Sequence, residues 1–363
     1  MVPLLVGESL ISQDGAVHAH MRSAMNECFQ PRLLAQARIG EMTKTIIERH
    51  ISQWHKQPQI ELMTEIRKLA LEVIFSIIGI ERQDLPLWER WYREFLYGAL
   101  PIPIALPGFP QWRGQRARAW LTARFLPILG AERQRPRRPG LLGNLVHGLD
   151  EQSRGLSDSE LIDNLLFLVL AGHETIASAM TWLALLLAGH PAWLARLQAE
   201  AEAAGSLPVC PTDLERSPVA EAFFRETVRL YPPIFMLTRE LTQEVTLHGH
   251  SLPKGTAVGV PLGRLARDPE QFPQPEHFKP ERWLSERQPA SPLLTCAFGV
   301  GPHFCLGYPL ALLEGVQFAQ IWAQSLARNR LRVQPCHPAP LTIRYAPFAQ
   351  PPPKLGVAFH AQS

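Results

Sequence analysis

The chain has 363 residues, 46% of them hydrophobic, which is enough to bury a sizeable core. Its formal net charge of +3 gives no reason to expect a polyanionic partner, and its arginine-rich stretches at 112–120 and 133–140 lack the pattern of a nucleic-acid-binding fold. The five cysteines are widely spaced, form no C-x-x-C pair and follow no secretory signal, which indicates a reducing, cytoplasmic setting.

Helical periodicity dominates the first part of the chain. Residues 16–95 repeat apolar side chains three and four positions apart. A proline-rich connection follows at 99–111, and further helices are predicted over 117–135 and 140–149.

The most apolar segment runs from Asp158 to His190. Ser157 stands just before it and Glu160 three positions later, a capping-box pattern that predicts the start of a helix. The segment is long enough to cross a membrane, which is the alternative interpretation. Charged and polar groups are costly in a bilayer, and this segment contains Asp163, Asn164, His173 and Glu174. We therefore favour a helix that is buried in a large soluble domain.

In the last third of the chain, the sequence pattern changes from helical periodicity to alternation and turns. Short strands are predicted over 239–262, a proline-rich irregular stretch covers 269–292, and a helix is predicted from about Leu306 to Arg328. The tail is typical of short strands and turns. With no visible repeat or linker, the sequence predicts a single domain over 1–363, mainly α with a small β portion.

The stretch FGVGPHFCLG (298–307) places a lone cysteine just before a predicted helix. Gly299 and Gly301 permit tight turns and close approach to a flat partner. Because a helix N-terminus lowers the pKa of a thiol, Cys305 is a candidate thiolate ligand for haem iron. The alternatives are a buried, inert cysteine, or a zinc site that lacks the usual paired spacing and would use Cys296, His303 and Cys305.

This stretch resembles the haem-binding signature of the cytochrome P-450 family, F-G-x-G-x-[R/H]-x-C-x-G, and matches it at every fixed place. The continuation YPLALLE is also similar to the family. The resemblance implies that Cys305 is the proximal iron ligand of a heme b (iron protoporphyrin IX), that Phe298 packs near its sulfur, and that His303 faces a haem propionate. The positions in this loop that it assigns to cofactor binding are Phe298, Gly299, Gly301, His303 and Gly307.

Two further positions in the early sequence resemble propionate partners. His18 and Arg22 are four apart in HAHMR, where a solvated surface pair is the alternative. DGAVHAHMR is similar to the early family helix whose His and Arg hold the propionates through charge-assisted bonds. Arg239, after YPPIFMLT, resembles another such partner.

The stretch AGHET (171–175) interrupts the apolar helix. Ala171 and Thr175 share a face, and a packing notch with a Thr hydroxyl bonded to the i−4 carbonyl is one interpretation. The stretch resembles the family's oxygen-binding motif, which implies that Thr175 hydrogen-bonds dioxygen and that Glu174 helps to relay protons. Ile176 stands where many relatives have a second Thr.

The stretch ETVR places Glu226 and Arg229 three apart on a helix. Alone it is typical of an exposed pair, but its apolar flanks predict burial, which requires further partners. The family has an E-x-x-R helix whose charges bond a later arginine, here Arg282, and the resemblance implies a structural role.

The resemblance covers nearly the whole chain, although relatives usually carry a longer segment before the DG…H…R helix. We therefore expect a cytochrome P-450 fold that is shortened at its N-terminus, with exposed edges in the strands over 243–262. The implied activity is that of a haem-thiolate monooxygenase, which inserts one oxygen atom from dioxygen into an apolar organic substrate. A non-catalytic haem-binding protein or truncated pseudoenzyme is the alternative.

An apolar substrate pocket is expected, of a kind that suits lipid-like, terpenoid or polyketide molecules. No flavin or iron–sulfur segment is recognisable, so electrons are expected from a separate donor such as a ferredoxin or a reductase. Ordinary core packing is the alternative for each candidate pocket residue, and these are Phe167, Leu168, Ala171, Ile234 and Phe235.

Overall fold

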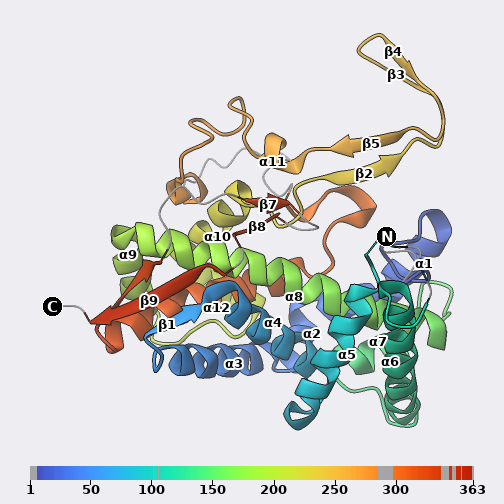
Figure 1. The fold of residues 1–363 in the computed structure, drawn as a ribbon, viewed down its shortest axis with the longest axis horizontal. Coiled ribbons are helices and arrows are strands. Elements are labelled where there is room, and N and C mark those ends of the chain that lie inside the picture. Colours follow the sequence, from blue (N-terminus) through green and yellow to red (C-terminus); the bar gives the residue numbers. More distant parts are fainter. Residues whose placement is uncertain are drawn as a thin grey trace.

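The computed structural model describes residues 6–100, 102, 104, 106–284, 297–336, 343–345, 349–352 and 354–361. Most of this part of the chain is helical, with small sheets beside the helices (Figure 1), so the predicted mainly-α architecture is confirmed. The α-helices are α1 (Gly15–Asn26), α2 (Pro31–Gln36), α3 (Ile39–Trp54), α4 (Leu62–Ile78), α5 (Leu85–Tyr97), α6 (Pro110–Arg133), α7 (Leu141–His147), α8 (Asp158–Gly189), α9 (Pro191–Ala203), α10 (Pro218–Leu230), α11 (Leu262–Leu265) and α12 (Tyr308–Arg328).

Within the described ranges, the strands form one sheet of three strands and three sheets of two. In the larger sheet, β9 lies between β1 and β6 and is antiparallel to both, so that Ile60 is opposite Val357 and Val333 is opposite Phe359. The strands are β1 (Gln59–Glu61), β2 (Leu237–Glu240), β3 (Val245–Leu247), β4 (His250–Leu252), β5 (Ala257–Val260), β6 (Leu331–Pro335), β7 (Arg344–Tyr345), β8 (Ala349–Gln350) and β9 (Gly356–Ala361).

Helix α8 is the central element, and it crosses the middle of the molecule in Figure 1. The predicted capping box is present: the Glu160 N–H donates to Ser157 Oγ at 3.3 Å, and the Ser157 N–H donates to the Glu160 carboxylate at 2.8 Å. Among the described helices, α8 alone is long and apolar enough to cross a membrane, but 67% of its most apolar window is buried inside the protein. This burial fits the predicted core helix.

Glycines allow the helices around α8 to approach closely. Helix α4 packs against α8, where a Cβ at Gly172 would lie 3.1 Å from the Ile74 side chain. Helix α12 packs against α10, where a Cβ at Gly315 would lie 2.4 Å from the Phe224 ring. Because interiors are close-packed, these contacts hold α12, and therefore the loop that precedes it, in a defined place.

The strands β2, β3, β4 and β5 form an arm that projects from the helical body (Figure 1). β2 pairs with β5 and β3 pairs with β4, and in the described chain neither pair has a third strand. The outer edges are thus unpaired, as expected, and the arm exposes Val245 and Leu247. Few core contacts support the arm, in contrast to the helices.

Candidate functional site

Cys305 lies in a closed loop immediately before α12. The Cys305 N–H donates to the Phe298 carbonyl at 2.9 Å, and α12 begins three residues later at Tyr308. Gly299 and Gly301 have φ angles of +77° and +69°, left-handed conformations that glycine adopts readily. A Cβ at Gly301 would meet none of the described residues within 4 Å, so among them there is space beside the loop.

The electrostatics of the Cys305 thiol differ from the sequence expectation. Burial raises the pKa of Cys305, whereas the Gly307 N–H and the positive charge of Arg22 lower it. Burial is the largest of these effects, so the helix terminus alone does not ionise the thiol. A coordinated cation deprotonates a thiol outright, so the raised pKa of Cys305 is compatible with a role as a metal ligand.

Cationic and imidazole groups from α1 gather at the Cys305 loop. Arg22 Nη1 donates to the Phe304 carbonyl at 2.7 Å. The ring of His18 lies against that of His303, with centroids 4.0 Å apart, and His303 Nε2 lies 3.0 Å from the Asp14 carboxylate. His18 is buried, and its Nε2 has no hydrogen-bond partner among the described residues. An unpartnered buried imidazole N–H beside two other donors fits an anionic group placed there, such as a haem propionate.

The zinc alternative finds no support in the part of the chain that the structure describes. Within that part, no three His, Cys, Asp or Glu side chains are arranged to hold a metal ion. Cys296 lies outside the described residues. Cys305 and His303 are the members of that set that the structure places.

One face of α8 is less buried than the remainder of the helix. Thr175 Oγ1 donates to the Ala171 carbonyl at 2.6 Å, the back-bond that the sequence left open. Leu168, another predicted pocket residue, is buried in the core and belongs to a different face. The half-buried face follows the helical spacing i, i+3, i+4, i+7, i+8 and consists of Phe167, Leu170, Ala171, Glu174 and Thr175.

The Glu174 carboxylate is enclosed by polar groups from three elements. Arg67 of α4 donates to Glu174 Oε2 from Nε at 3.2 Å and from Nη2 at 3.0 Å. Gln350 of β8 donates to the same oxygen at 3.1 Å, and His173 Nε2 lies 3.2 Å from Oε1. Burial acts to raise the pKa of Glu174, but the hydrogen bond and charge of His173 and the charge of Arg67 outweigh it, so the pKa is lowered.

Glu226, Arg229 and Arg282 lie in one buried network. Arg229 donates to both Glu226 oxygens at 2.8 and 2.9 Å, and Arg282 Nε lies 3.0 and 3.1 Å from them. Trp283 Nε1 and the Lys279 N–H also donate to Glu226, at 2.9 and 2.8 Å. These partners compensate the desolvation of the buried carboxylate, so the network braces α10 against the segment after Pro273.

The remaining candidates lie after α10. Ile234 and Phe235 are half-buried, and the Phe235 ring contacts Tyr345 of β7 edge-on, with centroids 4.8 Å apart. Arg239 is exposed on β2 and donates to the Thr238 carbonyl at 2.8 Å. The described contacts therefore do not bring Arg239 to the group of donors around His18.

Sequence reasoning missed several residues that the structure brings to the site. Tyr308 packs edge-on against Phe298, with centroids 4.8 Å apart, and its hydroxyl accepts from Arg225 Nη2 at 2.8 Å. The proximity of Tyr308 to Cys305 in the sequence could have indicated this position. Arg67 and Gln350 had no such signal, because they are 107 and 176 residues from Glu174.

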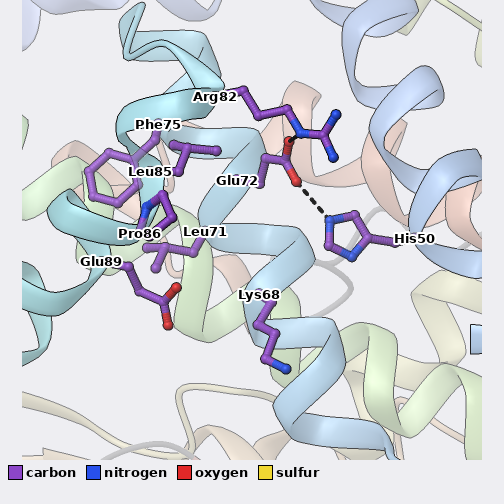
Figure 2. Close-up of a pocket in the computed structure, with 9 residues that line it drawn as sticks. All are labelled: His50, Lys68, Leu71, Glu72, Phe75, Arg82, Leu85, Pro86 and Glu89. Atoms are coloured by element: carbon purple, nitrogen blue, oxygen red, sulfur yellow. Dashed lines mark hydrogen bonds and ion pairs between the residues drawn. The ribbon is translucent and has the colours of Figure 1, made fainter. Parts of the chain in front are cut away.

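A separate pocket of about 210 Å³ lies between α3, α4 and α5 (Figure 2). His50 Nε2 lies 2.8 Å from the Glu72 carboxylate, which also pairs with Arg49. Lys68 and Glu89 at its rim pair with Glu65 and Arg93. Because these charged groups pair with one another, we assign the pocket a structural role where the three helices meet, separate from the Cys305 loop.

Comparison with known proteins gives a consistent result. The cytochrome P-450 family matches residues 132–357. Cytochrome P-450 BJ-4 of Bradyrhizobium diazoefficiens and its homolog in Sinorhizobium fredii are each 35% identical over 359 residues, which is 99% of this chain and 80% of theirs. The solved structure of retinoic acid bound cyanobacterial CYP120A1 has a TM-score of 0.85 and 28% identity, and the match covers 98% of this chain and 82% of that one.

Proposed function

This chain belongs to the cytochrome P-450 family and is a haem monooxygenase of that family, and from this premise we propose that Cys305 is the thiolate ligand of its haem iron. The observation that carries the proposal is the closed loop before α12, which holds a half-buried thiol beside Arg22 and space next to Gly301. The haem supplies, when bound, the redox chemistry that activates dioxygen.

The donors from α1 support the assignment of the propionate partners. Arg22 and His303 place hydrogen-bond donors beside the loop. The buried His18 Nε2 has no hydrogen-bond partner among the described residues, and a propionate carboxylate could be that partner. These three side chains would hold the propionates of the haem beside the Cys305 loop. Arg239 is the weakest of the predicted partners, because it lies exposed on the arm.

The half-buried face of α8 is proposed as the wall on which substrate and dioxygen meet. Thr175 presents a hydroxyl that can hold a proton and exchange it with a neighbouring oxygen, and Glu174 is the acid next to it in the chain. Phe167 and Ala171 give this face an apolar surface that excludes water. Ile234 and Phe235 are half-buried and are proposed as a second part of the wall.

The substrate is proposed to be an apolar, lipid-like or terpenoid molecule. The support is the apolar composition of the candidate wall, together with the retinoic acid in the cyanobacterial neighbour. A separate electron donor, a ferredoxin or a reductase, is proposed to supply two electrons. A cytoplasmic location is proposed from the free cysteines Cys28, Cys210, Cys305 and Cys336.

The experiment is a comparison of Cys305→Ser with Cys210→Ser, a matched change at a half-exposed free cysteine. The reduced, carbon monoxide-treated protein is expected to show the Soret band of thiolate ligation, and Cys305→Ser is expected to lose it while Cys210→Ser keeps it. An unchanged spectrum in Cys305→Ser would overturn the assignment. Retinoic acid serves as the first probe for a substrate-induced spectral shift. Substrate oxidation with a surrogate reductase would exclude the non-catalytic alternative.

A further inference from the structure

Glu174 forms a closed polar triangle with two residues from other parts of the chain. Arg67 and Gln350 both donate to Glu174 Oε2, at 3.0 and 3.1 Å. Arg67 Nη2 also donates to Gln350 Oε1 at 3.0 Å, which completes the third side. Each corner is thus held by the other two, and the orientation of the carboxylate is defined by α4 and β8 as well as by its own helix.

The triangle lies at the boundary between the core and solvent. The Glu174 side chain is 13% exposed and that of Arg67 is 38% exposed. The titratable and charged groups that face Glu174 are Arg67 from α4, His173 from α8 and Tyr92 from α5, whose pKa is raised by burial and by the charge of Glu174. The hydrogen bond and charge of His173, and then the charge of Arg67, lower the pKa of Glu174, and Arg67 is the member of this set whose positive charge is permanent.

Gln350 belongs to a hairpin that is attached to both walls of the proposed substrate site. Ser178 Oγ of α8 donates to the Ala349 carbonyl at 2.6 Å, and the Ala349 N–H donates to the Pro233 carbonyl at 2.8 Å. At the other strand, Tyr345 contacts the Phe235 ring. Strand β8 therefore connects Glu174, through Gln350, with Pro233, which lies two residues before Phe235.

We propose that Arg67 and Gln350 are positioning residues for the proposed oxygenase site: Arg67 fixes the Glu174 carboxylate and supplies a counter-charge, and Gln350 links that carboxylate to the β7–β8 hairpin. The predicted effect on turnover rests on the proposed function, whereas the predicted effect on the hairpin does not. The contacts themselves predict that the charge on Glu174 sets the stability of the hairpin. A change in the charge of Glu174 should therefore also affect the proposed substrate wall next to Phe235.

The first experiment measures amide hydrogen exchange in peptides that contain Ala349, in the full-length protein. Arg67→Gln, Glu174→Gln and Gln350→Ala are each expected to raise the exchange rate about tenfold, the effect of losing one charge-assisted contact. Arg67→Lys should restore most of the protection. Lys68→Gln, on the same helix but paired with Glu65, is the matched control and should leave the rate unchanged.

A double variant makes the first experiment specific. Because Arg67 contacts both Glu174 and Gln350, Arg67→Gln combined with Glu174→Gln should raise the exchange rate by less than the product of the two single effects. Additive effects, or unchanged exchange in both Arg67→Gln and Gln350→Ala, would overturn the proposal. This result does not depend on haem ligation, so it is distinguishable from a failure of the Cys305 assignment.

The second experiment uses the pH dependence of substrate oxidation in the haem-loaded protein. Removal of the positive charge of Arg67 raises the pH at which Glu174 takes up a proton, so the acidic limb of the profile should move to higher pH in Arg67→Gln. Arg67→Lys should move it back. An acidic limb that stays in place in Arg67→Gln, with the Lys68→Gln control also unchanged, would contradict the positioning role.

Discussion

The imidazole rings of His18 and His303 lie against each other, with centroids 4.0 Å apart and planes inclined by 37°, although 285 residues separate them in the chain. Burial, then the charges of His303 and Arg22, lower the pKa of His18. The His18 ring is therefore neutral near pH 7 and able to donate one N–H. The pair joins α1 to the Cys305 loop and leaves the His18 Nε2 available for a partner.

His18→Ala is expected to weaken haem retention. A hydrogen bond to a charged group contributes about 1.5–3 kcal/mol, so the haem dissociation constant should rise by about 10- to 100-fold. Transfer of haem to an excess of apomyoglobin measures the change. His20→Ala is the control, since His20 lies on the same helix but pairs with Asp150 at 2.8 Å. Equal haem loss from both variants would contradict the role of His18.

Glu226→Gln is expected to destabilise the protein strongly. The substitution leaves Arg229 buried without its counter-charge, and breaking a buried pair in this way costs about 3–5 kcal/mol. The free energy of unfolding in urea measures the loss. Glu221→Gln on the same helix removes a half-exposed partner of Arg225 and should cost less than about 1 kcal/mol. A similar, small loss in both variants would show that the network around Glu226 contributes little.

Glu72 is expected to make stability depend on pH in the acid range. Burial raises the pKa of Glu72, but hydrogen bonds from His50 and Arg49 outweigh it and lower the pKa from 4.5 to about 2. Because the folded value is depressed, the stabilisation is present above pH 4.5 and is lost as the pH falls toward 2. Glu72→Gln should therefore lose about 3 kcal/mol at pH 7 and show a smaller difference from the parent at pH 3.

Urea unfolding at both pH values checks the Glu72 prediction. Glu89→Gln, at the rim of the same pocket, is the matched control, because its side chain is 35% exposed and pairs with Arg93. The control should change stability little at either pH. If Glu72→Gln loses the same stability at pH 3 as at pH 7, the depressed pKa does not describe the folded protein.

Two glycine substitutions in helices should have opposite effects. Gly315→Ala places a Cβ 2.4 Å from the Phe224 ring, and such overpacking costs about 1–3 kcal/mol. Gly130→Ala, inside α6, meets nothing within 4 Å and should gain about 0.5–1 kcal/mol from helix propensity. Thermal unfolding distinguishes the two. A Gly315→Ala variant as stable as the parent would show that α10 and α12 separate easily.

The sequence predicted elements whose signals are local. The capping box at Ser157, the left-handed glycines around residue 300 and the E-x-x-R pair all depend on neighbours within a few positions. β1 escaped prediction because its three residues stand between two helices and owe their extended form to β9. The partners of Glu174 escaped for the same reason, since no periodicity connects residues 67, 174 and 350.

Leu168 shows how a helix separates neighbouring residues of the same type. It is apolar and adjacent to Phe167, so composition made both candidates for the pocket. Successive helical residues point about 100° apart, and the structure places Leu168 in the core and Phe167 on the half-buried face. The choice of face depends on which neighbours pack against α8, and those neighbours come from distant segments.

The three-stranded sheet constrains the order in which the polypeptide assembles. Ile60 pairs with Val357, so β1 gains its only described neighbouring strand after almost 300 further residues have been translated. The helices between them can dock beforehand, since their contacts lie within shorter spans. On the ribosome, therefore, this sheet is expected to stay open until β9 emerges, and its closure is expected to be a late step of folding.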